Sequence, residues 1–293
     1  MKPAAFEYAR PASLEEACAL LAQSDDARII AGGQTLVPLM AMRLARPRLL
    51  IDIARIGALA FIRREGDMVA IGATTRQCLL ERDPIIRSDL PLLAKVMPFI
   101  GHAPTRARGT VGGSLANADP AAEIALVAVT LGASLSYRDG DATAEIAAGD
   151  FFIGPMMTAL PATACLTAAR FPIWREARIG TGFHEVNARQ SDFAFAAAAA
   201  QLALDADGIC RRAAIGVGAV TMVPLRLAAV ADALLGTRCE AAQVRDAVTS
   251  ALAGIEPMAD LHASAAYRRR AAVSLAVRAI TDAYEAARDA NAC

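Results

Sequence analysis

Lysine, histidine and tryptophan are scarce in this chain of 293 residues. Lys2 and Lys95 are the only lysines among 30 basic residues, and there are three histidines and one tryptophan. Asp and Glu also number 30, so the formal net charge is zero. A zero net charge excludes a protein that coats nucleic acid with a uniformly basic surface. Three histidines also argue against a histidine-rich metal site.

Clustered cysteines are missing as well. No two of the six cysteines lie within four residues of each other, so the sequence has no CxxC spacing. This pattern argues against a locally encoded iron–sulfur cluster or zinc knuckle. We interpret the cysteines as buried or indifferent thiols of a reducing compartment; they are Cys18, Cys78, Cys165, Cys210, Cys239 and Cys293.

Long apolar runs are also absent. The longest, residues 193–204, contains Gln201 and is shorter than the ~20 residues that a membrane-spanning helix needs. The N-terminal residues show neither an apolar signal core nor a twin arginine, so we expect a cytoplasmic protein. The chain is nevertheless 55% hydrophobic, which excludes disorder and allows a large core. Its length favours two domains.

The first 55 residues predict a small α/β unit. Ser13 and Glu16 form a capping box before a helix, and strands are expected at 27–30 and 49–53 on either side of a glycine turn and a helix at 36–44. Further strands are expected at 68–73, 133–137, 142–146 and 166–171, with a helix at 124–131. The sequence changes character at 180–189. Beyond it we expect strands at 193–204 and 209–220, then helices at 227–235, 241–253 and 265–287.

The chain has two glycine loops that could bind a ligand. The first, Ala31–Leu36, is neither GxGxxG nor a P-loop, and the second runs from Gly109 to Pro120. Glycine loops expose backbone N–H groups that bind anionic oxygens, and Glu123 and Asp119 could accept hydrogen bonds from ribose hydroxyls. Two such loops without lysine suggest a dinucleotide held by backbone groups. Two unrelated turns remain the alternative at this point.

Several segments, in order along nearly the whole chain, resemble the FAD-binding medium subunit of molybdenum hydroxylases. These are the flavoproteins of the aerobic carbon monoxide dehydrogenase and xanthine dehydrogenase family. The matching segments are 31–53, 100–123, 151–155, 182–194 and, near the C-terminus, 262–269. Ala103-Pro104-Thr105 departs from the family pattern close to the expected flavin ring.

The resemblance implies an α+β fold. It predicts an FAD-binding domain of the vanillyl-alcohol oxidase type at 1–176, with subdomains at about 1–55 and 56–176. A C-terminal domain with a three-stranded antiparallel sheet and helices would follow at 177–293. The resemblance also implies an oxidoreductase subunit that is catalytically incomplete alone. Its partners would be a large molybdopterin subunit and a small subunit with two [2Fe–2S] clusters, in a dimer of heterotrimers. Electrons would pass from the clusters through FAD to an external acceptor.

The resemblance also assigns cofactor-binding residues, and it assigns no catalytic or metal-binding ones. We expect non-covalent FAD, because no histidine lies in the first glycine loop. Glu123 is the better candidate for the ribose or adjacent phosphate region, and Asp119 is expected to shape the turn. The predicted residues are Ala31, Gly32, Gly33, Gln34, Thr35, Leu36, Gly101, Thr105, Thr110, Gly112, Gly113, Ser114, Asn117, Asp119, Glu123, Leu166 and His184.

Two histidines have open roles. His184 falls where some relatives place a lysine near the flavin, and a surface histidine at a strand edge is the alternative. We expect His102 to be structural rather than a general base, because the cofactor supplies the redox chemistry.

Two other functions compete with the leading one. The chain could be a self-contained FAD-dependent oxidoreductase of the same superfamily, but the match at His262–Arg269 argues against it. It could also be a nucleotide-binding or assembly protein that has lost flavin, but the intact glycine loops argue against that. The sequence names neither the hydroxylated substrate nor the electron acceptor.

Overall fold

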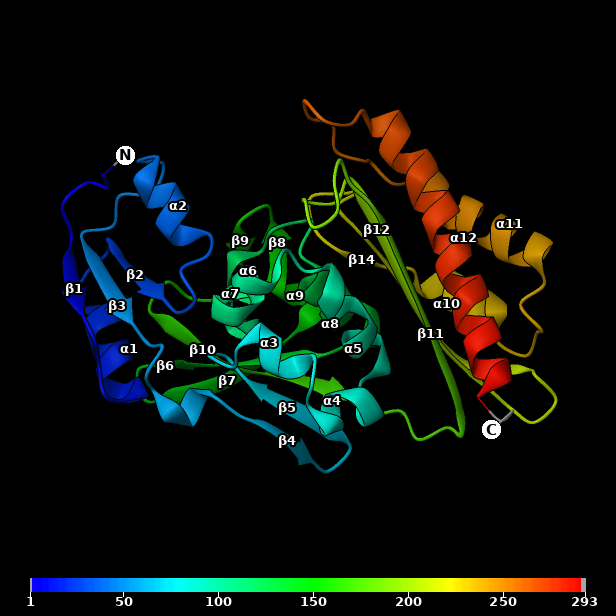
Figure 1. Ribbon diagram of the computed structural model, residues 1–293, viewed down its shortest axis with the longest axis horizontal. Helices are drawn as coiled ribbons and strands as arrows, with labels where there is room; N and C mark the ends of the chain where they lie inside the picture. The colour runs from blue at the N-terminus through cyan, green and yellow to red at the C-terminus, as the bar shows by residue number, and fades with distance from the viewer. Residues whose placement is uncertain (1, 291–293) are drawn as a thin grey trace.

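The computed structural model describes residues 2–290, and three units follow one another along its longest axis (Figure 1). The N-terminal unit lies at one end, a central unit in the middle and a C-terminal unit at the other end. The expectation for the Cys293 thiol lies outside the described residues. No helix among the described residues has the length and apolarity needed to span a bilayer.

The N-terminal unit is the predicted small α/β unit. Its strands form a parallel sheet in the order β1-β3-β2. The Ser13 hydroxyl accepts a hydrogen bond from the Glu16 N–H and begins helix α1, as the capping box predicts. The apolar face of α1, with Ala17 and Leu21, packs in one cluster with Ile51 of the sheet. The elements are β1 (Glu7–Ala9), α1 (Leu14–Ala22), β2 (Ala27–Ile30), α2 (Leu36–Ala41), β3 (Leu49–Asp52) and η1 (Gly57–Leu59).

The central unit is built on a five-stranded antiparallel sheet in the order β4-β5-β10-β6-β7. Helix α8 is buried throughout 124–131, as expected for the apolar run found there. The strands are β4 (Ile62–Glu65), β5 (Met68–Gly72), β6 (Ser134–Asp139), β7 (Ala142–Ala147) and β10 (Ala164–Pro172), with the hairpin β8 (Phe152–Gly154) and β9 (Met157–Thr158). The helices are α3 (Gln77–Leu80), α4 (Pro84–Asp89), α5 (Pro91–Val96), η2 (Met97–Phe99), α6 (Ala103–Arg108), α7 (Val111–Asn117), α8 (Glu123–Leu131) and α9 (Ala148–Phe151).

The C-terminal unit contains an antiparallel meander in the order β11-β12-β13-β14. It has one strand more than the three expected, because the two-residue β14 pairs with the end of β13. One face of the sheet packs against α12, and the other against α5 and α8 of the central unit (Figure 1). The elements are β11 (Arg178–Val186), β12 (Ala196–Leu204), β13 (Cys210–Gly218), β14 (Leu225–Arg226), α10 (Ala228–Leu234), α11 (Ala241–Ala253) and α12 (Ala265–Asp289).

Small residues bring α12 directly onto this sheet. A Cβ atom on Gly182 of β11 would lie 1.9 Å from the backbone oxygen of Ala279, and one on Gly180 would lie 2.0 Å from that of Ala283. All nine residues of β12 are buried. A strand covered on both faces reads as a continuous apolar run, which is why the alanine run does not alternate with polar residues.

Candidate functional site

A cavity of about 650 Å³ is lined by both glycine loops. This volume lies within the range of small-molecule and cofactor sites. The cavity extends from the end of β2 in the N-terminal unit to α7 and α8 of the central unit, and the segment 191–193 completes the lining. Every predicted cofactor-binding residue except His184 lines it.

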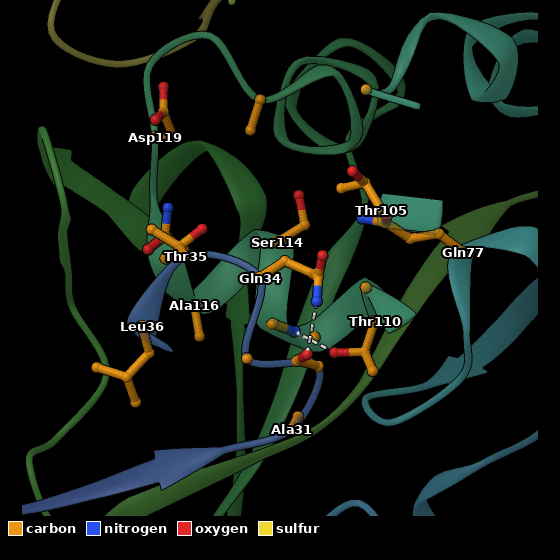
Figure 2. A pocket seen from close by; sticks show the side chains of 18 of the residues that line it. Ala31, Gln34, Thr35, Leu36, Gln77, Thr105, Thr110, Ser114, Ala116 and Asp119 are labelled. Atoms are coloured by element: carbon orange, nitrogen blue, oxygen red, sulfur yellow. Dashed lines mark hydrogen bonds between the residues drawn. The ribbon is translucent and has the colours of Figure 1, made fainter. Parts of the chain in front are cut away.

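The first glycine loop follows β2 and contacts the second. Gly33 has φ +70°, a conformation that glycine adopts without steric cost. A Cβ on Gly32 would lie 2.5 Å from the backbone oxygen of Arg108, so glycine is needed for the two loops to touch. The Gln34 side-chain amide donates to the Gly32 oxygen at 3.1 Å, which folds this loop upon itself (Figure 2).

The second glycine loop is held against the central sheet. Gly112 N–H donates to the Ala73 oxygen at 2.8 Å, and Gln77 N–H donates to the Gly109 oxygen at 3.0 Å. The Thr110 hydroxyl accepts from Gly113 N–H at 3.0 Å and caps α7. Figure 2 shows Thr110 and Ser114 on this side of the cavity, near Gln34 of the first loop. These hydrogen bonds fix the position of the second loop in the central unit.

Two acidic residues follow α7 and have different surroundings. The Asp119 carboxylate accepts from Ala121 N–H at 2.9 Å, as expected of a residue that shapes the turn. Glu123 is the first residue of α8, and burial raises the pKa of its carboxyl to about 7. Near neutral pH, Glu123 can therefore donate a hydrogen bond as an acid or accept one as a carboxylate.

A second buried carboxyl, which sequence reasoning missed, lies on the C-terminal unit. Glu185 of β11 has its pKa raised to about 8, first by burial and then by the neighbouring Glu123 charge. Its Oε1 accepts from the Asn187 amide at 2.9 Å, while its buried Oε2 has no hydrogen-bond partner among the described residues. No local sequence pattern predicts this pair, because the two acids are brought near each other only by packing of β11 against the central unit.

The donors and charges of the cavity fit an FAD molecule. Arg28 is the single Lys or Arg in the lining, so backbone N–H groups of the glycine loops must supply most contacts to a pyrophosphate. Gln77 also lines the cavity, and its buried Oε1 has no partner among the described residues.

Gln77 and the segment Ser191–Phe193 were not assigned to the site from sequence. Gln77 reaches the cavity because its N–H pairs with Gly109, a contact that no local motif encodes. The Asp192–Ala194 segment was part of the resemblance, and that signal could have indicated Asp192 and Phe193. His102, expected to be structural, lines the cavity as the residue before α6.

His184 is the one predicted residue that the structure does not bring to the cavity. Along β11, Gly182 and His184 face α12, while Phe183 and Glu185 face the central unit, because side chains alternate along a strand. The His184 ring lies 2.8 Å from the Asp282 carboxylate of α12.

Comparisons with known proteins agree with this arrangement. Residues 4–174 match the family model "FAD binding domain in molybdopterin dehydrogenase", and residues 181–283 match "CO dehydrogenase flavoprotein C-terminal domain". The first model covers more than half of the chain. The chain belongs to the FAD-binding medium subunits of the molybdenum hydroxylase family.

Relatives of this medium-subunit family match along almost their whole length. The 6-hydroxypseudooxynicotine dehydrogenase complex subunit alpha of Paenarthrobacter nicotinovorans is 34% identical, covering 98% of this chain and 97% of the relative. The carbon monoxide dehydrogenase medium chain of Afipia carboxidovorans is also 34% identical, with 96% and 97% coverage. Among solved structures, carbon monoxide dehydrogenase from Hydrogenophaga pseudoflava, lacking the Mo-pyranopterin moiety of the molybdenum cofactor, superposes with a TM-score of 0.93 at 34% identity, covering 98% of this chain and 99% of that one.

The expected α+β fold, with an FAD-binding domain and a C-terminal domain, is confirmed. So is the expected role as an FAD-containing oxidoreductase subunit. Among the described residues, no group of three or more histidine, cysteine or acidic side chains is placed to hold a metal ion.

Proposed function

We propose that the cavity between the glycine loops holds non-covalent FAD and that this flavin relays electrons from a partner to an external acceptor. The observation that carries the proposal is the convergence of both loops on one cavity of about 650 Å³. FAD supplies the electron chemistry when bound. The chain positions it: loop N–H groups bind the pyrophosphate, and Glu123 contacts the ribose or phosphate region.

The partners in this proposal are a molybdopterin-containing large subunit and a [2Fe–2S] small subunit, assembled as a dimer of heterotrimers. Two observations support it. The relatives are a medium chain and a complex subunit by name, and the solved carbon monoxide dehydrogenase is an enzyme of the molybdenum cofactor. We also propose the domain limits 1–176 and 177–293, with subdomains at about 1–55 and 56–176. Both matched family models and the boundaries of the sheets support this division.

The flavin site can be tested with two valine variants. Gly33→Val and Gly113→Val should weaken FAD binding by about tenfold or more, because a branched side chain resists φ +70° at Gly33 and would place its Cβ 2.7 Å from the Thr110 hydroxyl at Gly113. FAD titration followed by flavin fluorescence measures the change. Gly140→Val is the control, because Gly140 also has positive φ but lies in the β6–β7 turn with nothing near its Cβ. Unchanged FAD affinity in both cavity variants would contradict the site.

The subunit role can be tested with the isolated chain. Expressed alone and loaded with FAD, it should not hydroxylate organic substrates with a dye acceptor, and activity should require the molybdenum and iron–sulfur partners. Copurification from a host that makes the complex should recover both. Turnover by the isolated chain at the rate of the complex would instead establish the self-contained oxidoreductase.

A further inference from the structure

Helix α12 carries an arginine that is almost completely buried. The Arg268 side chain is 2% exposed, and it forms an ion pair with Asp260 through Nη2. Its Nη1 donates to two backbone oxygens, that of Phe195 at 2.6 Å and that of Ala219 at 2.7 Å. A buried guanidinium is costly unless it is paired and hydrogen-bonded, so the environment of Arg268 is built around these three partners.

The first acceptor lies just after the segment that completes the cavity lining. Phe195 lies two residues after Phe193, the last lining residue of the 191–193 segment. Its N–H donates to the Val186 oxygen at 2.7 Å, which fixes the end of this segment on β11. The Phe195 ring stacks on His262 with centroids 6.0 Å apart and planes 11° from parallel. Arg268 and His262 therefore hold Phe195 from the backbone and from the ring.

The second acceptor leads to the acidic loop of the cavity. Ala219 follows β13, and its N–H donates to the Pro120 oxygen at 2.8 Å. Pro120 lies between Asp119 and Ala121, both of which line the cavity. One nitrogen of Arg268 thus links the two segments through which the C-terminal unit meets the proposed flavin site.

We propose that Arg268 is a positioning residue for the flavin cavity, holding segment 191–193 and the 119–123 loop in the geometry that binds FAD. This inference rests on the proposed function of the cavity. None of the hydrogen-bond partners of Arg268 among the described residues lines the cavity, so it acts through the Phe195 and Ala219 carbonyls. It gives a role to the C-terminal motif, residues 262–269, which the flavin site itself does not use.

The main test compares Arg268→Met with Arg269→Met in the full chain. Arg269 is the adjacent residue of α12, and it also donates to a backbone oxygen, that of Ile255 at 2.6 Å, but away from the cavity. Arg268→Met should weaken FAD binding by about tenfold or more, whereas Arg269→Met should change it by less than about twofold.

A readout that separates positioning from plain stability is the rise in melting temperature on adding FAD. A purely structural role would lower the melting temperature equally with and without FAD, and the FAD-induced rise would stay as in the wild type. The proposal expects a smaller rise in Arg268→Met, because a ligand stabilises in proportion to its affinity for the folded state. The visible circular dichroism of bound flavin should also change. An unchanged rise together with an unchanged spectrum would overturn the proposal.

Two milder variants cover the case in which Arg268→Met fails to fold. Asp260→Asn removes the ion pair but keeps both carbonyl contacts, so FAD affinity should stay within about twofold of the wild type. Arg268→Lys keeps the charge but loses the fork that spans the partners, so it should weaken FAD binding severalfold. Equal losses in both variants would show that charge pairing, not the two carbonyls, matters, and would overturn the proposal.

The outcome is distinguishable from failure of the flavin site itself. If Gly33→Val and Gly113→Val reduce FAD binding while Arg268→Met and Arg268→Lys do not, the flavin site stands and the role of Arg268 is refuted. If none of the four variants affects FAD binding, the proposed flavin site is refuted and the role of Arg268 with it.

Discussion

Glycine and alanine have different effects in the flavin-binding half and in the C-terminal half: in the first they shape an open cavity, and in the second they allow a closely packed core. Around the cavity, Gly32 lets two loops touch, and the lining keeps polar atoms such as Gln77 Oε1 without partners among the described residues. In the C-terminal half, Gly182 brings a helix onto a sheet, and all nine residues of β12 are buried. Glycine and alanine therefore do not by themselves distinguish a binding site from a closed core. The atoms packed against each glycine or alanine determine whether it lines a binding site or belongs to a core.

The largest predicted effect is a loss of stability in the C-terminal half, and it tests whether this half is the more tightly packed one. Gly182→Ala would place a methyl group 1.9 Å from the Ala279 backbone oxygen, so α12 must move off the sheet. We expect a loss in unfolding free energy of about 3 kcal/mol or more, because overpacking against backbone cannot be relieved by a side-chain rotation. Urea denaturation measures it.

Gly254→Ala is the control for this variant, since nothing lies near its Cβ at the end of α11. Stability within about 0.5 kcal/mol of the wild type is expected for it. A similarly small loss in Gly182→Ala would show that the two halves do not differ in tightness of packing.

The stability of the protein should depend on pH through Glu123 and Glu185, which lie where the C-terminal half packs against the flavin-binding half. We expect an effect of intermediate size. The pKa values of Glu123 and Glu185 are raised to about 7 and about 8, so the folded state binds more protons than the unfolded state between about pH 4.5 and pH 8. Stability without FAD should be greatest below pH 4.5 as far as these groups are concerned, and it should fall as pH rises through 7 to 8. Both side chains are only partly buried, so solvent screening reduces the effect of the full pKa shifts, and the expected contribution is on the order of 1–3 kcal/mol.

Glu185→Gln should flatten this pH profile, measured by urea denaturation between pH 5 and pH 8.5, while the exposed Glu256→Gln serves as a control. A profile in Glu185→Gln as steep as in the wild type would mean that Glu185 does not contribute to the pH dependence of stability.

The smallest effect concerns a second arginine, in the flavin-binding half. Arg106 Nη1 donates to the oxygens of Ile100 and Gly101 at 3.0 and 2.8 Å, and both residues line the cavity. Arg106→Met should weaken FAD binding about threefold to tenfold, because two carbonyls lose a charged donor at one edge of the site. Fluorescence titration with FAD tests it. Arg87→Met is the control: this exposed arginine donates to the Glu81 oxygen outside the lining. Equal FAD affinities of Arg106→Met and Arg87→Met would mean that an arginine positions the cavity only from the C-terminal half.

Local patterns predicted much of the secondary structure. The capping box at Ser13 and Glu16 begins α1, and the helix expected at 241–253 has those limits in the structure. The strand expected from Phe193 instead begins at Ala196, because the preceding residues turn toward the cavity and Phe195 pairs with Val186. The alanine run at 196–200 favours helix by propensity, yet it forms a strand because partners on both faces exclude water from it.

Local sequence patterns predicted that two glycine loops could bind a ligand through their backbone, because glycine spacing and neighbouring hydroxyls can be read without the fold. Its match to the medium-subunit family also indicated FAD. Packing of distant elements, which no local pattern encodes, brings the charge of Glu123 near Glu185, places the His184 ring beside Asp282, and directs Arg268 to the carbonyls of Phe195 and Ala219. Arg268 and Ala219 are 49 positions apart in the chain, and His184 and Asp282 are 98 apart. Contacts over such separations depend on how strands and helices pack rather than on any local pattern.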